Sequence, residues 1–465
     1  MGSDEGKKPA PCRVKLVHVA AASVVLWLVV LDSQARRLHT PPASLRGLGR
    51  AQTNGAPDGA QPPGAQAKPS TGAANGVLRS GGDAVHVVFS TDCGAYQTWQ
   101  AEVLYHSAEL VGQPGTITRI VSGCDDAGRQ ALEQRHLAAD LAGRFLVHFT
   151  PHFSKDANGA DYKFYNKPFG VLHWLNHAPV PEDVVALIDP DFIFLRRLVN
   201  DFSNASTVIS TTHQASTQTR VTKGRPVSQF YGLGDEWLKL DRGKICGNAS
   251  RCARTTSDEA WKSFSVGPPY MAHKDDLLLI AQKWVEFVPR VFSQYPFLLA
   301  EMFAYSMAAA HLGLSHLRFD SFMVSNVASY GEAWQWIDAS PISTCDVSKP
   351  QDLWPSRNVP VFLHYCQGYA WGKWHYGKHR VPLDVFSNCQ ERVIERPTKA
   401  EIGGDLYARA AVGDKAARDE RRNLFALCAG ADTVNAVSKK FSALRLRSDG
   451  GEACPVALPA LPLLL

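Results

Sequence analysis

Residues 184–191, which read VVALIDPD, join five consecutive apolar residues to two aspartates that flank a proline. Five apolar residues in a row are typical of a strand that is buried on both faces of a parallel sheet. The carboxylates of Asp189 and Asp191 then follow at the carboxyl end of the strand, where open α/β sheets bind their ligands. This stretch therefore predicts both the type of sheet and the place of a ligand site.

Alternating strand and helix patterns surround this stretch. Residues 85–89 (VHVVF) and 117–121 (ITRIV) are short apolar runs that predict buried strands. From Tyr96 onward apolar residues recur at helical spacing, and residues 166–177 predict a second helix with Asn166 as its cap. Strands that alternate with helices are typical of a three-layer domain, so we expect an α/β fold with a mainly parallel central sheet.

The second half of the chain predicts three longer helices. One begins near Asp275, another begins at Pro296 and carries Glu301 one turn further on, and a charged helix covers residues 422–440. The chain ends in PVALPALPLLL, which is too short and too interrupted by proline to span a membrane.

Composition excludes some classes of protein. The 465 residues carry a net charge of +5, with 49 Lys and Arg against 44 Asp and Glu. Charge this dilute does not indicate a protein that binds nucleic acid by neutralising phosphates. The length is enough for one large or two medium domains.

One segment indicates a membrane. Residues 16–31 are uncharged and largely apolar, and they follow a basic stretch that includes Lys15. We expect an uncleaved signal anchor with residues 1–15 in the cytoplasm and the rest of the chain lumenal. The alternative is a cleaved secretory signal, because small residues at Ser33 and Ala35 suit a signal peptidase.

A low-complexity stem follows this segment. Residues 41–82 contain 6 Pro, 9 Gly and 8 Ala and no aromatic residue, so they cannot offset the entropy of ordering a chain. We expect residues 32–83 to be a flexible stem, residues 84–395 to form the main domain, and residues 396–465 to be a partly disordered extension.

Cysteine usage agrees with a lumenal chain. Nine of the ten cysteines follow the apolar segment, and none forms a C-x-x-C pair of the zinc type. Disulfides are therefore expected, with Cys246 and Cys252 close enough to close a small loop, and an odd count of nine leaves at least one thiol. Asn204 and Asn248 begin N-x-S sequences that accept N-linked glycans in such a compartment.

The residues themselves favour metal chemistry at Asp189 and Asp191. Oxygen ligands at a strand end suit Mg²⁺ or Mn²⁺ that carries a nucleotide diphosphate. The structural alternative is a polar turn that caps backbone groups. A metal-dependent phosphohydrolase would need more carboxylate and His ligands near this pair than the sequence offers.

Six stretches in order resemble a known family. They are HVVFSTDCGAYQTWQAEVLYHS (86–107), PGTITRIVSG (114–123), YNKPFGVLHWL (165–175), ALIDPDFIFLRRL (186–198), LLAEMFAYSMAAAHLG (298–313) and FLHYCQGY (362–369). On these stretches the chain resembles the plant and algal hydroxyproline O-arabinosyltransferases and peptidyl-serine α-galactosyltransferases. Phe192 stands where the arabinosyltransferases carry a His, so the donor sugar stays open between arabinofuranose and galactose.

The resemblance implies a GT-A-type nucleotide-sugar transferase, anchored as a single-pass type II protein in the Golgi or the endoplasmic reticulum. It implies that Asp189, Asp191 and His364 hold Mn²⁺ or Mg²⁺ and the diphosphate of a UDP-sugar. The alternative for His364 is a core histidine that donates to a backbone carbonyl. The resemblance also favours Glu301 as general base, the alternative being a helical Glu that faces solvent.

Three further residues are candidates for donor binding. Asn166 and Lys167 open a helix, and a helix start beside a cation suits phosphate or a uracil carbonyl. Ser90 follows the first strand, where a uridine lies in sheets of this kind. The late aromatic residues are assigned to the core, although their faces suit proline-rich peptide; they are Trp334, Trp336, Tyr369, Trp371 and Trp374.

We therefore expect a metal-dependent glycosyltransferase that moves a sugar to a hydroxyproline or serine hydroxyl of a secretory-pathway glycoprotein. The alternative is a lumenal protein that binds glycan or peptide without turnover. The sequence leaves the stereochemistry of transfer open.

Overall fold

The computed structural model describes residues 83–448, apart from 139–142, 156–158, 160, 205–217, 330, 340–344, 346–358, 388–392 and 412. The expected anchor, the stem up to residue 82 and the apolar C-terminal tail lie outside this part of the chain. Within the described part, no helix combines the length and the apolar character that a membrane span requires.

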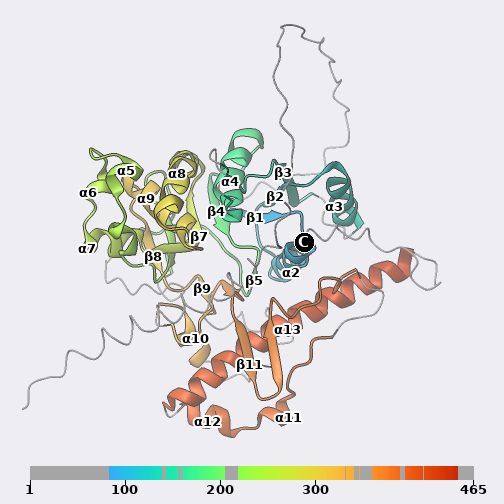
Figure 1. The fold of residues 1–465 in the computed structure, drawn as a ribbon. Coiled ribbons are helices and arrows are strands. Elements are labelled where there is room, and N and C mark those ends of the chain that lie inside the picture. The colour runs from blue at the N-terminus through green and yellow to red at the C-terminus, as the bar shows by residue number, and fades with distance from the viewer. Residues whose placement is uncertain are drawn as a thin grey trace, which may run out of the picture. The chain divides into compact units, whose positions relative to one another are not determined.

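A seven-stranded sheet forms the centre of the fold and confirms the α/β prediction (Figure 1). The strands β3, β2, β1 and β4 pair in parallel, β7 is antiparallel to β4 and to β6, and β8 is parallel to β6. The sheet is therefore mainly parallel. In sheet order the strands are β3 (Phe145–Thr150), β2 (Ile117–Ser122), β1 (His86–Asp92), β4 (Val184–Ile188), β7 (Val266–His273), β6 (Val227–Phe230) and β8 (Leu317–Phe319).

Helices cover both faces of this sheet (Figure 1). Side chains of β1 and β4 on one face, such as Val88 and Leu187, pack in one apolar cluster with α4 (Asn166–His177), α8 (Lys274–Gln294) and α9 (Ala300–Leu312). On the other face, Val87 and Phe89 pack in a second cluster with α2 (Ala95–Leu110). Burial on both faces explains why the strands are continuously apolar.

A smaller sheet and a hairpin lie beyond the main sheet. The small sheet has the order β5 (Phe192–Phe194), β10 (Phe362–His364) and β9 (Met323–Val324). The hairpin consists of β11 (Gly368–Trp371) and β12 (Trp374–Gly377). Because β5 directly follows Asp191, this small sheet brings residues from the second half of the chain to the end of β4.

The predicted charged helix is part of a longer one. Helix α13 (Lys415–Ser448) packs its apolar face, including Leu424 and Phe425, into the same cluster as α2 and β1. The boundary that we expect at residue 395 stays a prediction, but this helix shows that residues beyond it contribute to the core. Helix α3 (Asp126–Ala138) connects β2 to β3. The remaining helices are short and lie in connections: η1 (Lys163–Tyr165), η3 (Glu236–Lys239), α5 (Arg242–Cys246), α6 (Arg251–Arg254), α7 (Ser257–Glu259), η4 (Ala260–Phe264), α10 (Trp334–Asp338), α11 (Lys399–Ile402) and α12 (Asp405–Ala411).

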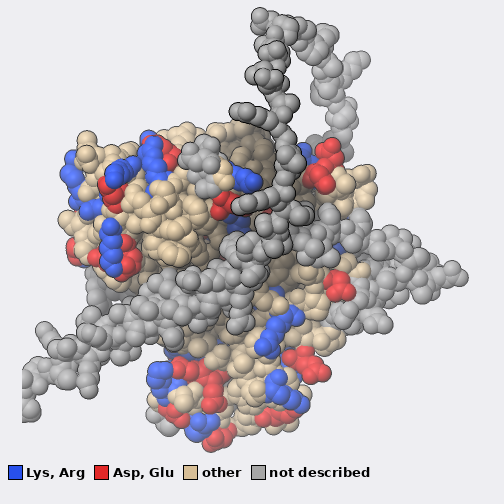
Figure 2. Space-filling model, in the orientation of Figure 1, with Lys and Arg blue, Asp and Glu red and all other residues tan. Residues whose placement is uncertain are grey.

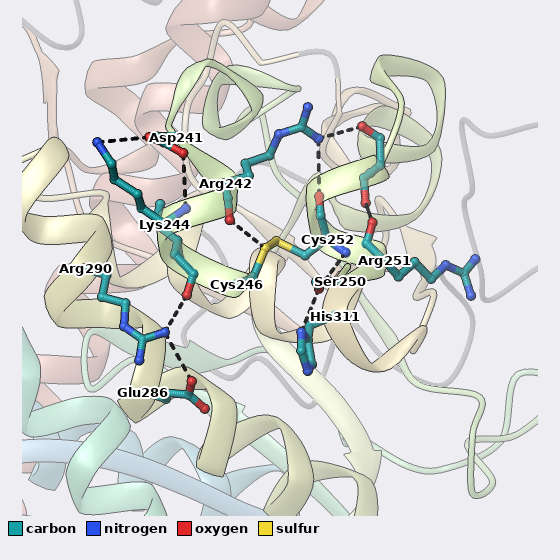
Figure 3. The surroundings of a disulfide bond; sticks show 12 residues. Asp241, Arg242, Lys244, Cys246, Ser250, Arg251, Cys252, Glu286, Arg290 and His311 are labelled. Carbon is teal, nitrogen blue, oxygen red and sulfur yellow. Dashed lines mark hydrogen bonds and ion pairs between the residues drawn. A yellow bond between two sulfur atoms is a disulfide. The ribbon is translucent and has the colours of Figure 1, made fainter. Parts of the chain in front are cut away.

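Three disulfides are present in the described part of the chain, and Cys366 is a free thiol there. The predicted Cys246–Cys252 bond is confirmed, whereas the sequence did not predict the pairs Cys93–Cys124 and Cys345–Cys428. Arg290 of α8 donates to the Ile245 carbonyl, next to Cys246, at 2.7 Å. Figure 3 shows Arg290 beside the Cys246–Cys252 disulfide. This contact fixes the disulfide loop to the main domain.

Two local predictions are wrong. Helix α9 begins at Ala300 rather than at Pro296, because the backbone before it is held in a loop in which the Phe297 N–H donates to the Tyr295 carbonyl. Asn166 does not cap α4, because its side-chain oxygen accepts from the Phe153 N–H at 2.7 Å instead.

Charges on the visible surface are mixed. Figure 2 shows Lys and Arg side chains interspersed with Asp and Glu side chains, with no large basic face on the side shown. Most of the surface ion pairs join neighbours in the chain, such as Lys262 with Asp258 and Lys283 with Glu286. This distribution is that of an ordinary solvated surface.

A buried polar network closes the amino-terminal end of β1. The two ring nitrogens of His86 bind the Glu182 carboxylate and the Thr118 hydroxyl, each at 2.8 Å, and the second Glu182 oxygen accepts from the Thr116 N–H at 2.7 Å. Burial alone would raise the pKa of Glu182, but its bonds with His86 and Thr116 outweigh burial and lower the pKa to about 2.

This network predicts a stability that depends on pH. The pKa of Glu182 is lower in the folded chain than the usual 4.5, so its contribution is present above pH 4.5 and is lost as the pH falls toward 2. We therefore expect Glu182→Gln to cost about 1–2 kcal/mol at pH 7 and progressively less between pH 5 and pH 3. Urea unfolding at several pH values measures the difference. The exposed Glu133→Gln is the control, and a cost for Glu182→Gln that stays constant down to pH 3 would contradict the assignment.

Candidate active site

Two carboxylates follow β4 and differ in their surroundings. Asp189 is partly exposed, whereas Asp191 is 4% exposed. The pairing of Phe89 with Ile188 places the end of β1 beside them, so Ser90 lies at the same edge of the sheet. These positions agree with the rule that ligands bind at the carboxyl ends of strands.

His364 reaches the same place from the small sheet. It pairs with Phe192 across β10 and β5, one residue after Asp191. Its Nε2 lies 3.4 Å from Asp191 Oδ1, and Asp189, Asp191 and His364 each offer a ligand atom within 4.8 Å of the others. The structure thus brings the three predicted metal ligands together.

The chemistry of this donor set fits a divalent cation. Two carboxylates and one imidazole are the oxygen and nitrogen ligands that Mn²⁺ accepts, and Mg²⁺ accepts the oxygens. Asp191 uses Oδ2 for Lys378 and faces His364 with Oδ1, so one carboxylate serves both neighbours. The residues present therefore fit the metal that the sequence predicts.

Lys378 is a member of the site that sequence reasoning missed. It follows β12 directly, and its Nζ lies 2.6 Å from Asp191 Oδ2. Burial alone would raise the pKa of Asp191, but Lys378 and His364 outweigh it and hold the pKa well below its usual range. Burial alone would lower the pKa of His364, but Cys366 and Asp191 outweigh it and hold the pKa well above 6.5.

Lys167 joins Asp189 to Glu301. Its Nζ lies 2.8 Å from Asp189 Oδ1 and 2.9 Å from Glu301 Oε1, so the two carboxylates are one ammonium group apart. Burial by itself would lower the pKa of Lys167, but these two carboxylates outweigh it and raise the pKa well above 10.5. Lys167 therefore stays charged and holds Glu301 close to Asp189, one of the predicted metal ligands.

Glu301 is buried rather than exposed. It is 5% exposed and lies in the first turn of α9, where the helix dipole favours a carboxylate. Burial raises the pKa of Glu301, and Lys167 opposes this shift without cancelling it. The second oxygen, Oε2, is buried and has no hydrogen-bond partner in the structure. A carboxylate oxygen of this kind is available to a hydroxyl that enters the site.

The start of α4 is less available to a ligand than the sequence suggests. The 3₁₀ turn η1 precedes the helix, and the Asn166 N–H already bonds to the Lys163 carbonyl. Asn166 itself is buried. The donor-binding roles of Ser90, Asn166 and Lys167 stay predictions, and Lys167 is the one whose side chain contacts both Asp189 and Glu301.

Aromatic side chains form the walls of this site. The Tyr231 hydroxyl lies 3.5 Å from His364 Nδ1, and Tyr96 stacks on His379 next to Lys378. The stacked pair Trp371 and Trp374 belongs instead to the hairpin. The sequence could not tell which of these aromatic residues lie at the site, because aromatic side chains are common both in a core and around a ligand site.

Comparison with known proteins supports the resemblance. Residues 85–236 match the model of the hydroxyproline O-arabinosyltransferase family N-terminal domain. A peptidyl serine alpha-galactosyltransferase of Arabidopsis thaliana is 29% identical over 246 residues, which are 50% of this chain and 26% of that protein. A hydroxyproline O-arabinosyltransferase of Medicago truncatula is 26% identical over 262 residues, which are 53% of this chain and 62% of that protein. The predicted resemblance to this family is confirmed, and the chain spans less than two thirds of the length of either relative.

The chain also aligns with a solved structure at low similarity. The galactosyltransferase LgtC, determined with donor and acceptor sugar analogs, is 12% identical, with coverage of 70% of this chain and 95% of that chain and a TM-score of 0.34.

The two aspartates should differ in their effect on stability. Asp191→Asn removes the charge of a buried carboxylate and leaves the half-buried Lys378 ammonium without its partner, so we expect a loss of about 3 kcal/mol in the free energy of unfolding. Asp189→Asn changes a partly exposed carboxylate and leaves Lys167 bound to Glu301, so it should cost less than about 1 kcal/mol. Urea unfolding without added metal measures both.

A double variant separates the charge from other effects. Lys378→Met should restore most of the stability that Asp191→Asn loses, because it removes the unpaired ammonium. Equal stability of the two aspartate variants, or no recovery in the double variant, would show that the Asp191–Lys378 pair is not what stabilises this end of the sheet.

Proposed function

We propose that the chain is a GT-A-type glycosyltransferase that moves a sugar of the arabinofuranose or galactose class from a UDP-sugar to a serine or hydroxyproline hydroxyl of a glycoprotein. The observation that carries this proposal is the convergence of Asp189, Asp191 and His364 at the end of β4. Glu301 lies close to them, because the Lys167 ammonium group contacts both Asp189 and Glu301. The likeness to peptidyl serine and hydroxyproline glycosyltransferases supports the choice of acceptor.

Asp189, Asp191 and His364 would hold the metal ion. When bound, a divalent cation stabilises the negative charge that a departing diphosphate gathers. The chain's own cations act in the same direction. Lys378 lies against Asp191 and Lys167 lies against Asp189, and ammonium groups at this place would also suit phosphate oxygens of the donor.

Glu301 would take the acceptor's proton. The acceptor oxygen forms a bond to the anomeric carbon, the bond from that carbon to the diphosphate breaks, and the nucleoside diphosphate leaves with the electron pair. The hydroxyl proton passes to the unpartnered Glu301 Oε2. Lys167 positions Glu301 through Oε1 and leaves Oε2 for this step.

We also propose that the protein acts in the Golgi or the endoplasmic reticulum as a single-pass type II membrane protein, with residues 84 onward in the lumen. Residues 16–31 and their basic flank support this orientation. Three disulfides agree with an oxidising compartment.

Donor binding should depend on the metal site. Asp189→Ala removes a metal ligand, so we expect binding of UDP in the presence of Mn²⁺ to fall at least tenfold, to the level that the unaltered chain shows in EDTA. Isothermal titration calorimetry measures this, with Asp183→Ala at the opposite end of β4 as a matched control. Undiminished UDP affinity in Asp189→Ala would contradict the proposed metal site.

Transfer should depend on Glu301. Glu301→Gln keeps the shape and removes the basicity, so UDP binding should survive while the transfer rate falls by about 10²- to 10⁴-fold. The assay is transfer of sugar from a UDP-sugar panel to a serine- or hydroxyproline-containing peptide. Near-normal turnover by Glu301→Gln would remove Glu301 from the role of base and would favour a mechanism that retains the anomeric configuration, which NMR of the product would test.

A further inference from the structure

The Cys246–Cys252 disulfide encloses one of the two N-x-S sequences of the chain. Asn248 begins this sequence, and Ser250 supplies the hydroxyl that such a sequence requires. Residues 247–249 are exposed, so the surface around Asn248 is open to solvent. This sequence lies about 60 residues before Glu301 and outside the site described above, and the proposed transfer reaction does not use it.

The backbone of this loop forms a tight turn. The Ser250 N–H donates to the Gly247 carbonyl at 3.0 Å, which closes a turn that contains Asn248. Gly247 has a φ of +84°, a conformation that suits glycine. The bond between Cys246 and Cys252 then joins the two ends of the turn. In the folded chain Asn248 is therefore held in a compact, covalently closed loop.

The Ser250 hydroxyl is already occupied in the closed loop (Figure 3). It accepts from the Cys252 N–H at 3.1 Å, and it lies 2.7 Å from Nδ1 of His311 in α9. The first of these bonds caps α6, and the second ties the loop to α9. An enzyme that glycosylates asparagine has to recognise this hydroxyl, because the sequence requires Ser or Thr at this position. The closed loop therefore engages the very group that such an enzyme needs.

We propose that Asn248 carries an N-linked glycan and that the glycan is added before the Cys246–Cys252 bond closes. This inference rests on the lumenal location proposed above, because N-linked glycans are added in the lumen. The Asn248 amide nitrogen forms a bond to the anomeric carbon of an oligosaccharide, and the bond from that carbon to a lipid diphosphate breaks. The lipid diphosphate leaves with the electron pair, and the amide gives one proton to a base of the glycosylating enzyme.

Translation of the full chain into microsomes of the endoplasmic reticulum tests the site. The microsomes contain the glycosylating enzyme and its lipid-linked donor. All chains carry Asn204→Gln, which leaves one natural site, and an N-x-T tag after Leu465, which reports whether that end reaches the lumen. We expect glycan on both Asn248 and the tag, measured by a gel shift that an endoglycosidase removes and by mass spectrometry of peptides. Ser250→Ala should lose the glycan on Asn248 and keep the glycan on the tag.

A reversible competitor tests the order of the two events. Chains made in the presence of a permeable N-x-T tripeptide fold without glycans, and the tripeptide is then washed out. The tag should now be modified, whereas Asn248 should gain less than a tenth of the glycan that it gains during synthesis. Cys246→Ser with Cys252→Ser keeps the loop open and should gain at least threefold more glycan at Asn248. Cys93→Ser with Cys124→Ser, which removes a disulfide elsewhere in the fold, is the matched control and should gain none.

The outcomes separate this inference from the proposed location. A tag without glycan during synthesis refutes the lumenal location and the inference with it. Glycan on the tag but none on Asn248 during synthesis refutes the inference alone. Equal gain at Asn248 by folded and by growing chains, or equal gain by the two cysteine variants, shows that closure of the loop does not set the order and overturns it. The UDP titration described above tests the transferase proposal independently of all these results.

Discussion

The carboxylate of Asp191 is buried, and a buried charge is stable only when it is paired. Its partners come from residues that are remote in the chain: Lys378 after the hairpin strand β12 and His364 in β10. The Asp191 carbonyl also accepts from the Tyr365 N–H at 3.1 Å. This requirement fixes where the second half of the chain must return, because the small sheet and the hairpin have to meet the end of β4 for the charge to be satisfied.

Lys167 plays the corresponding part on the other side of the site. It separates two carboxylates that would otherwise repel each other, and it couples Asp189 to Glu301 through two short contacts. A cation shared in this way is well suited to a site that changes its charge during a reaction.

The elements that carry these residues divide the site into two parts. The ends of β1 and β4 with β10 and β12 present carboxylates, an imidazole and an ammonium, which suit a metal ion and phosphate. The start of α9 presents the buried carboxylate of Glu301, whose unpartnered oxygen suits a hydroxyl group that enters the site. Tyr162 and Lys167 join the parts, because Tyr162 holds the backbone of Glu301 and Lys167 holds its side chain.

The sequence by itself determined the features that depend on near neighbours in the chain. A run of apolar residues at 184–188 is enough for a buried strand, and the two aspartates that follow it must lie at its carboxyl end. Six stretches in order were enough for the family resemblance, and the spacing of Cys246 and Cys252 was enough to predict their disulfide. Only the tertiary structure decided the rest. Lys378 looks like any other lysine until the chain places it 2.6 Å from a carboxylate 187 positions earlier, and the pairing of Cys345 with Cys428 depends on a distance in space that spacing does not encode. The partner of Asn166 was likewise set by a residue outside the local pattern, and Tyr162 bonds the backbone of Leu298 and Glu301 around the start of α9. A backbone or side-chain group bonds to whichever partner the fold brings within reach.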